Sequence, residues 1–110
     1  MNAGRMDRRV QFLRAGIIDD GLQERLGPHV PYGSPVWASK TPISDGERFR
    51  ADTVAQDRTD RFVVRYSALT ASITGKDRLV CEGVTYGIAG RKEIGRREGI
   101  EITASRVDAV

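Results

Sequence analysis

The chain has 110 residues, of which 30% are charged and 39% hydrophobic, with 12 glycines, one cysteine and a net charge of +3. A chain of this length makes one domain with a single core, and one cysteine excludes an internal disulfide and a thiolate metal cluster. No stretch reaches the ~18 consecutive apolar residues of a membrane span, and the N-terminal MNAGRMDRRV lacks the apolar run of a signal peptide. We therefore expect one domain over residues 1–110, in the cytoplasm or in a particle assembled there.

Alternation of apolar and polar residues predicts short strands. The first runs from Arg8 to Arg14, with Val10 and Phe12 on one face. Residues 15–35 are rich in glycine and proline, so we expect a long irregular loop that orders on a partner. Residues 36–43 predict the second strand, with Trp37 as its largest anchor and Pro42 at a strand end or edge.

The second half of the chain predicts four more strands. Ser44 and Glu47 have the spacing of a capping box, so a short helix is expected over 46–55. Strands follow over 61–67, over 78–81 and 84–90 as a hairpin, and over 99–107. Cys81 is expected as a small core residue. This pattern predicts an all-β fold, a small antiparallel β-barrel or sandwich of about six strands with a long first loop and a short helical or irregular insertion.

The sequence carries no recognisable active-site pattern. His29 is the only histidine and has no nucleophile motif near it. Asp19 and Asp20 lack the spacing of a calcium loop, and the glycines of GRKEIGRREG lack the context of a phosphate-binding loop. We therefore expect no enzymatic activity, no metal and no cofactor.

Arginine supplies most of the 18 basic residues, which suits paired contacts with carboxylate or phosphate at interfaces. Acidic residues alternate with the basic ones, which favours a solvated surface over a dedicated nucleic-acid face. One basic cluster keeps a free-standing nucleic-acid-binding barrel open as an alternative function. It consists of Arg91, Lys92, Arg96 and Arg97.

Five pieces of sequence occur in a characteristic order. They are GRMDRRVQFLR, a glycine-containing loop leading to VWAS, PISDGERFRA, RFVVRY, and DRLVCEGVTYGIAG followed by GIEITAS. In this order the chain resembles the phage head-tail joining family, the connector or stopper (head-closure) proteins of long-tailed phages and gene transfer agents. The resemblance covers nearly the whole chain.

The resemblance implies a β-barrel subunit of a homo-oligomeric ring below the portal, with about six copies expected. Such a ring extends the DNA channel, retains packaged DNA and docks the tail. The implied partners are the portal-side adaptor, the tail terminator or tube proteins, and double-stranded DNA passing without sequence recognition; no membrane is involved. The implied location is a virion or phage-like particle assembled in the bacterial host cytoplasm. A tail-completion protein is the alternative within the same particle.

Two regions are the candidate contact sites. The loop over 15–35 is too apolar for a purely solvated loop, so it either contacts a neighbouring protein or folds back on its own barrel. Its candidate interface residues are Ile17, Ile18, Leu22, Leu26 and Tyr32. The insertion over 44–59 is the candidate channel-facing element, where interleaved acids would keep DNA from binding tightly. Its candidate residues are Arg48, Arg50 and Arg58.

Overall fold

The structure is a computed structural model that describes residues 6–19, 21, 24–43 and 59–107, with the backbone alone for 17–19 and 24–26. Within these residues it contains a 7-stranded sheet and a short helix. The elements are β1 (Arg8–Asp19), β2 (Glu24–Pro31), β3 (Val36–Pro42), β4 (Thr59–Arg65), α2 (Ala68–Ala71), β5 (Arg78–Cys81), β6 (Val84–Ile94) and β7 (Gly99–Arg106).

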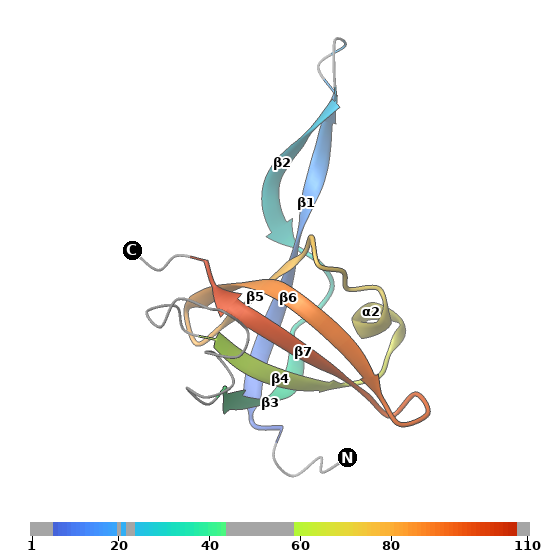
Figure 1. The fold of residues 1–110 in the computed structure, drawn as a ribbon. Coiled ribbons are helices and arrows are strands. Elements are labelled where there is room, and N and C mark those ends of the chain that lie inside the picture. Colours follow the sequence, from blue (N-terminus) through green and yellow to red (C-terminus); the bar gives the residue numbers. More distant parts are fainter. Residues whose placement is uncertain (1–5, 20, 22–23, 44–58, 108–110) are drawn as a thin grey trace.

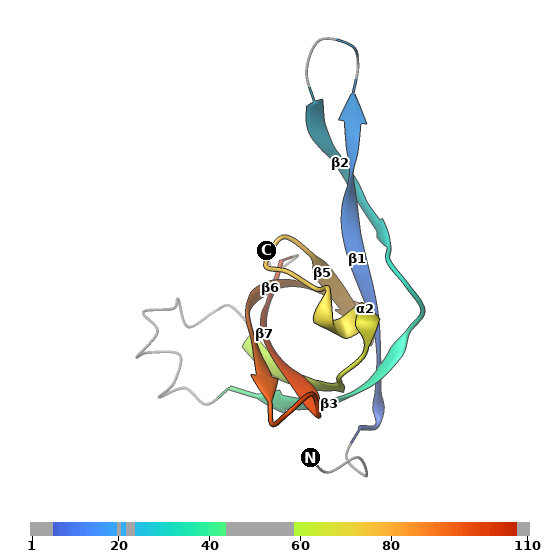
Figure 2. The same ribbon diagram turned by 90° about the vertical axis from the view of Figure 1, so that its right-hand side faces the viewer.

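All the strands except β2 close into an antiparallel barrel in the order β1-β3-β4-β7-β6-β5, which is visible end-on in Figure 2. Strand β1 closes the barrel, because its residues 8–10 pair with β3 and its residues 10–13 pair with β5. Closure removes the free edges that an open sheet presents to other chains. The predicted all-β barrel is confirmed.

Side chains at alternate strand positions fill the barrel. The largest are Phe12, Phe62 and Tyr86, and the rings of Phe62 and Tyr86 meet edge to face with centroids 5.1 Å apart. The Tyr86 hydroxyl donates a 2.8 Å hydrogen bond to Oδ2 of buried Asp60, which helps to offset the cost of placing a carboxylate in the core. The rest of the core is Val10, Ala38, Val64, Ile73, Leu79, Cys81, Ile88, Ile100, Ile102 and Ala104. The inward face predicted for the first strand, with Val10 and Phe12, is confirmed, as is the burial of Cys81.

The hairpin between β5 and β6 has the predicted two-residue turn. Cys81 pairs with Val84, and the intervening Glu82 and Gly83 have φ values of 53° and 79°. Two consecutive positive φ values define a type I′ turn, whose twist matches that of the flanking strands. The alternation over this stretch therefore identified both strands and the turn.

The expected irregular loop over 15–35 is wrong for most of its length. Strand β1 continues to Asp19 and pairs with β2 in antiparallel register, from Leu13 with Pro31 to Asp19 with Glu24. The strands tolerate the glycines and prolines because the register shifts between Ala15 and Ile17 and because β2 is the edge strand of the described sheet. Figure 1 shows the described part of this ribbon, residues 14–19, 21 and 24–31, projecting from the barrel. We call the segment 14–31 the arm.

Two further expectations about local structure have different outcomes. Trp37 is not a core anchor: its side chain is 53% exposed, whereas the next residue, Ala38, is fully buried. Alternation along β3 turns one of these neighbours inward and the other outward.

The helix expected over 46–55 lies outside the described residues. A short helix is present at α2 instead, where Ser67 and Thr70 form a reciprocal capping box.

Replacing Gly33 by alanine is expected to lower the free energy of unfolding by about 1–2 kcal/mol. Gly33 has φ +75°, and a Cβ there would lie 2.6 Å from Cδ1 of Leu69, so the variant is strained even if Leu69 moves. Urea unfolding followed by circular dichroism measures the change. Gly90→Ala is the matched control, since nothing lies within 4 Å of a Cβ at Gly90, and equal losses in both variants would contradict the prediction.

Candidate functional site

His29 and Cys81, the residues considered for catalysis, both lie on strands of the sheet. His29 lies on β2 opposite Ala15, and its Nε2 is 3.3 Å from the carbonyl oxygen of Lys76. Cys81 is buried, and this burial raises the pKa of its thiol, which disfavours the reactive thiolate. Among the described residues, no group of three or more His, Cys, Asp or Glu side chains is placed to hold a metal ion. Interaction surfaces are therefore the candidate functional sites.

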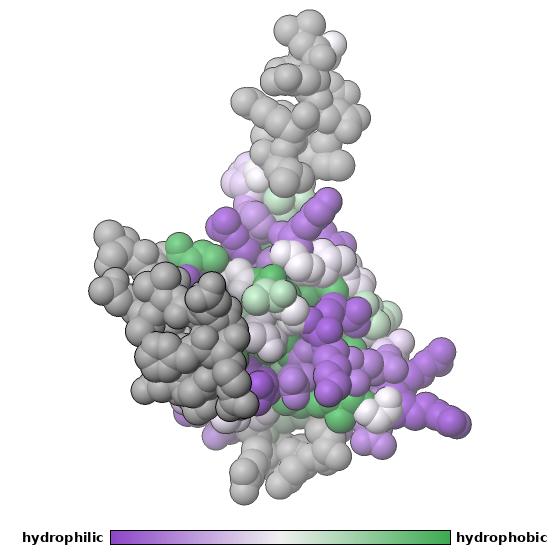
Figure 3. All heavy atoms as spheres, in the orientation of Figure 1, coloured by the Kyte–Doolittle hydropathy of each residue, from purple (hydrophilic) through white to green (hydrophobic). Residues whose placement is uncertain are grey.

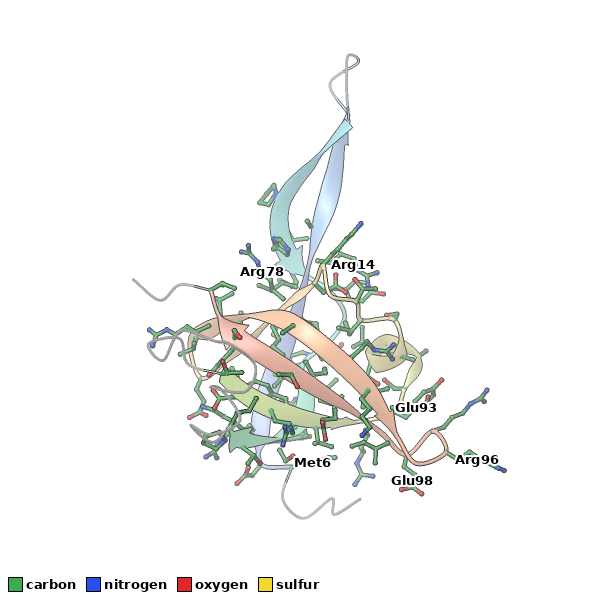
Figure 4. The ribbon with its side chains drawn as sticks, viewed as in Figure 1. Met6, Arg14, Arg78, Glu93, Arg96 and Glu98 are labelled. Atoms are coloured by element: carbon green, nitrogen blue, oxygen red, sulfur yellow. The ribbon has the colours of Figure 1, made fainter. Side chains whose placement is uncertain are left out.

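A cluster of polar contacts fixes the arm to the barrel at the point where β1 leaves it. The Arg14 guanidinium donates two 2.9 Å hydrogen bonds to the carboxylate of Asp77 and one of 2.8 Å to the carbonyl oxygen of Ser72. It also lies 3.9 Å from the ring centroid of Tyr32, at the end of β2. The Tyr32 hydroxyl is 2.9 Å from Oγ of Ser72. We call these four residues the root clamp, and Figure 4 shows Arg14 at the base of the arm.

The clamp has a charged pair at its centre. Burial of the Asp77 carboxylate acts to raise its pKa, but the hydrogen bonds from Arg14 and from the backbone N–H of Thr74 outweigh it. The pKa of Asp77 is therefore lowered, and the hydrogen bond to Asp77 raises the pKa of Arg14. Both groups stay charged at neutral pH, so the ribbon is fixed to the barrel by a bidentate ion pair.

The root clamp predicts a specific pH dependence of stability. A carboxylate whose pKa is lower in the folded chain stabilises it above its unfolded pKa of about 3.9, and this contribution is lost as the pH falls through the folded value. Wild type is thus expected to be more stable than Asp77→Asn by a constant margin above pH ~5, and the margin should close below pH ~4. Denaturant unfolding of both proteins across this range measures it. A margin independent of pH would contradict the charged pair.

An exposed aromatic side chain lies at the opposite end of β1. The Trp37 ring is covered on one side by the guanidinium of Arg9, its cross-strand partner, at 4.5 Å from the centroid. It borders a hollow of about 400 Å³ lined by Met6, Asp7 and Arg65 as well. Figure 4 shows Met6 at the end of the barrel away from the arm. We call Trp37, Arg9, Arg65, Met6 and Asp7 the tryptophan patch.

The basic cluster predicted from sequence lies at the end of the β6–β7 hairpin. Figure 3 shows hydrophilic side chains covering this projecting tip, and Figure 4 places Arg96 at its end, with Glu93 and Glu98 nearby. The four basic residues, Arg91, Lys92, Arg96 and Arg97, are all exposed. Within the described part of the chain, none of them forms an ion pair with a carboxylate that would neutralise it.

The predicted contact residues have separate locations. The backbone of Ile17, Ile18 and Leu26 lies on the arm, whereas Tyr32 belongs to the root clamp and packs against the barrel core. Leu22, Arg48, Arg50 and Arg58 lie outside the described residues. Sequence reasoning did not predict the pairing of Arg14 with Asp77, because 63 residues separate them and no local pattern signals it.

Comparisons with known proteins agree on one fold. A sequence model of phage head completion proteins matches residues 1–107. The solution structure of protein SF1141 from Shigella flexneri 2a aligns with a TM-score of 0.70 and 21% identity over 98% of each chain. A chain in the virion of a native gene transfer agent particle aligns with a TM-score of 0.65 and 24% identity, covering 94% of this chain and 96% of that one. No curated protein matches the sequence.

The two structural matches show the shared fold, and the sequence model shows the family because it spans nearly the whole chain. The resemblance identified from five pieces of sequence is confirmed. No helix in the described ranges is long and apolar enough to cross a membrane. The chain belongs to the phage head completion protein family and is a structural protein of the virion.

Proposed function

We propose that copies of this protein form a ring at the head–tail interface that extends the DNA channel, retains packaged DNA and docks the tail. The observation that carries the proposal is the match to head completion proteins over residues 1–107. A filled head needs its DNA exit closed and a tail-binding surface formed there, and a ring below the portal meets both needs. The similar fold in a gene transfer agent virion supports the same placement.

The shape of the subunit suits a ring wall. A closed barrel presents few unpaired strand edges, so its neighbours are selected by side chains and projecting elements. The arm and the β6–β7 tip both project from the described barrel (Figure 1). We assign the arm, with Ile17, Ile18, Leu22 and Leu26, to contacts with neighbouring proteins, including the portal-side adaptor or the tail proteins.

The channel surface must let DNA move. Each phosphate that a basic side chain neutralises strengthens binding and its salt dependence, so a lumen with many such contacts would retard the DNA. The insertion with Arg48, Arg50 and Arg58 remains our candidate for the channel-facing element, because acidic residues alternate with these arginines. The β6–β7 tip, where Glu93 and Glu98 accompany four basic residues, has the same mixed character.

Deletion of the gene from its source element tests the proposal. We expect electron microscopy to show separate heads and tails, with heads that have lost their DNA, and expression of the wild-type protein in trans to restore whole particles. Full heads beside defective tails would instead support the tail-completion alternative. Normal tailed particles would overturn the head–tail assignment altogether.

The exposed basic tip supports a second candidate, a nucleic-acid-binding barrel that acts without a ring. It predicts saturable binding of duplex DNA by the isolated protein. For each phosphate contacted, the logarithm of the binding constant should fall by about 0.9 for every tenfold rise in salt concentration. The ring proposal expects only weak binding of this kind. Reversing Arg96 and Arg97 to glutamate, with Arg78→Glu as a control on β5, would show whether the tip carries any DNA affinity.

A further inference from the structure

We propose that the outer end of the arm of one copy docks on the tryptophan patch of the next copy and so closes the ring. This rests on the proposed function only in requiring that copies of the chain meet in the particle. It names the surface that receives the arm, which the sequence and the family leave open. We call residues 17–26 the arm tip.

The tryptophan patch has the composition of a protein-binding site. Trp37 is the largest of the exposed hydrophobic side chains, and interface hot spots are enriched in Trp and Arg. A second hollow, of about 250 Å³ and lined by Val36, Trp37, Arg65, Ser67 and Thr70, adjoins the first. The indole ring of Trp37 lies between these two hollows, and the side chains of a neighbouring copy can pack against it and fill them.

The patch carries positive charge. Arg9 and Arg65 are exposed, and in the described part of the chain neither has a carboxylate as an ion-pair partner. Asp7 is the one acid of the patch, and its carboxylate lies 3.5 Å from the guanidinium of Arg8. The site therefore favours an apolar segment that also carries carboxylates.

The arm tip has that composition. Its sequence, IIDDGLQERL, combines four large aliphatic residues with three acids and a single arginine. The acids are Asp19, Asp20 and Glu24, two of which pair with each other across the ribbon as the last register positions of β1 and β2. The net charge of the arm tip is therefore negative, opposite to the charge of Arg9 and Arg65.

The two surfaces cannot meet within one copy. Arg9 and Asp19 lie on the same strand, which at ~3.3 Å per residue separates them by about 33 Å, and the arm projects away from the barrel (Figure 2). Two different complementary surfaces on one chain give a head-to-tail contact, and repetition of such a contact closes a ring when the rotation permits.

The arm docks by its side chains and not by adding a strand. The Tyr32 N–H donates to the carbonyl oxygen of Phe12 on β1, so alternation turns the nitrogen of the preceding Pro31 toward the outer edge of the ribbon, where it has no hydrogen to donate. Extension of a neighbouring sheet along this edge is therefore disfavoured. A wedge of apolar and acidic side chains entering the hollows beside Trp37 has no such restriction.

Photo-crosslinking in assembled particles tests the proposal. p-Benzoylphenylalanine replaces Trp37 in the full chain, which keeps an aromatic ring at the site, and mass spectrometry identifies the linked peptides. We expect links to residues 17–26 of another copy. The same probe at Val107, which is 44% exposed, is the matched control and should not link to the arm tip. Links from position 37 only to another virion protein or to DNA, or no link at all, would overturn the docking while leaving the ring in place. Absence of the protein from purified particles would overturn the proposed function itself.

Charge exchange provides a second test. Arg65→Glu is expected to lower the yield of whole particles by about tenfold, and adding Asp19→Arg in the same chain should restore most of it. Arg78→Glu, an equal charge change at another exposed position, should leave the yield unchanged. Circular dichroism and urea unfolding of the purified variants establish that each one folds. Failure of Asp19→Arg to rescue a folded Arg65→Glu protein would contradict the pairing of these surfaces.

Discussion

Replacing Phe62 by alanine is expected to lower the free energy of unfolding by about 3–5 kcal/mol. Phe62 is fully buried on β4, and its ring contacts that of Tyr86 edge to face, a geometry worth about 0.5–1.5 kcal/mol beyond the buried area. Truncation leaves a cavity that the barrel cannot close, because paired strands surround it and fix their separation. Because the free energy of unfolding of a small domain is only about 5–15 kcal/mol, the variant should be close to unfolding at 37 °C.

Two variants control for this effect. Val63→Ala changes the adjacent, outward-facing and only partly buried residue and should cost less than about 1 kcal/mol, as most substitutions near the surface do. Phe62→Leu keeps most of the volume and should fall between the two. Urea unfolding followed by circular dichroism gives all three values. If Val63→Ala cost as much as Phe62→Ala, the assignment of inward and outward faces on β4 would be wrong.

Local alternation was sufficient to predict most of the barrel. Side chains at i and i+2 share a face in any strand, so the inward residues of β4 and β7 could be identified without knowing which strands are neighbours. The turn at Glu82 and Gly83 could also be predicted, because a two-residue hairpin turn requires positive φ values and glycine adopts them easily. Strand order and closure through β1 depend on contacts between distant residues, and only the structure shows them.

The arm was missed because its composition resembles that of a loop. Gly16, Gly27 and Pro28 lie at or beside the register shift, where the ladder is already interrupted, so they do not prevent pairing on either side. The same reasoning misplaced Trp37: its size suggested a core anchor, but Ala38 holds the inward position. Its exposure, which local sequence did not signal, makes it the centre of the surface that we assign to the neighbouring copy.

Replacing Arg14 by methionine is expected to destabilise the protein by about 2–3 kcal/mol and to release the arm from a fixed orientation. Methionine keeps much of the apolar stem but removes the 2.9 Å bonds to Asp77, the 2.8 Å bond to Ser72 and the contact with the Tyr32 ring. The cost lies at the low end for a broken ion pair, because the Arg14 side chain is 37% exposed and water screens part of the lost attraction. Urea unfolding gives the overall change, and amide hydrogen exchange near Tyr32 reports the loosened root.

The penalty in Arg14→Met should come largely from the Asp77 carboxylate, which stays buried without its cation. The double variant Arg14→Met with Asp77→Asn removes that charge, so it should lose less than the sum of the two single variants by about 1–2 kcal/mol. Strict additivity would show that the two side chains stabilise the fold independently. If the arm acts through a fixed direction, Arg14→Met should lower the yield of whole particles more than its loss of stability accounts for, with Gly33→Ala as a variant that is also destabilised but keeps the ion pair at the root intact. Equal yields would mean that the direction of the arm is set by the neighbouring subunit during assembly.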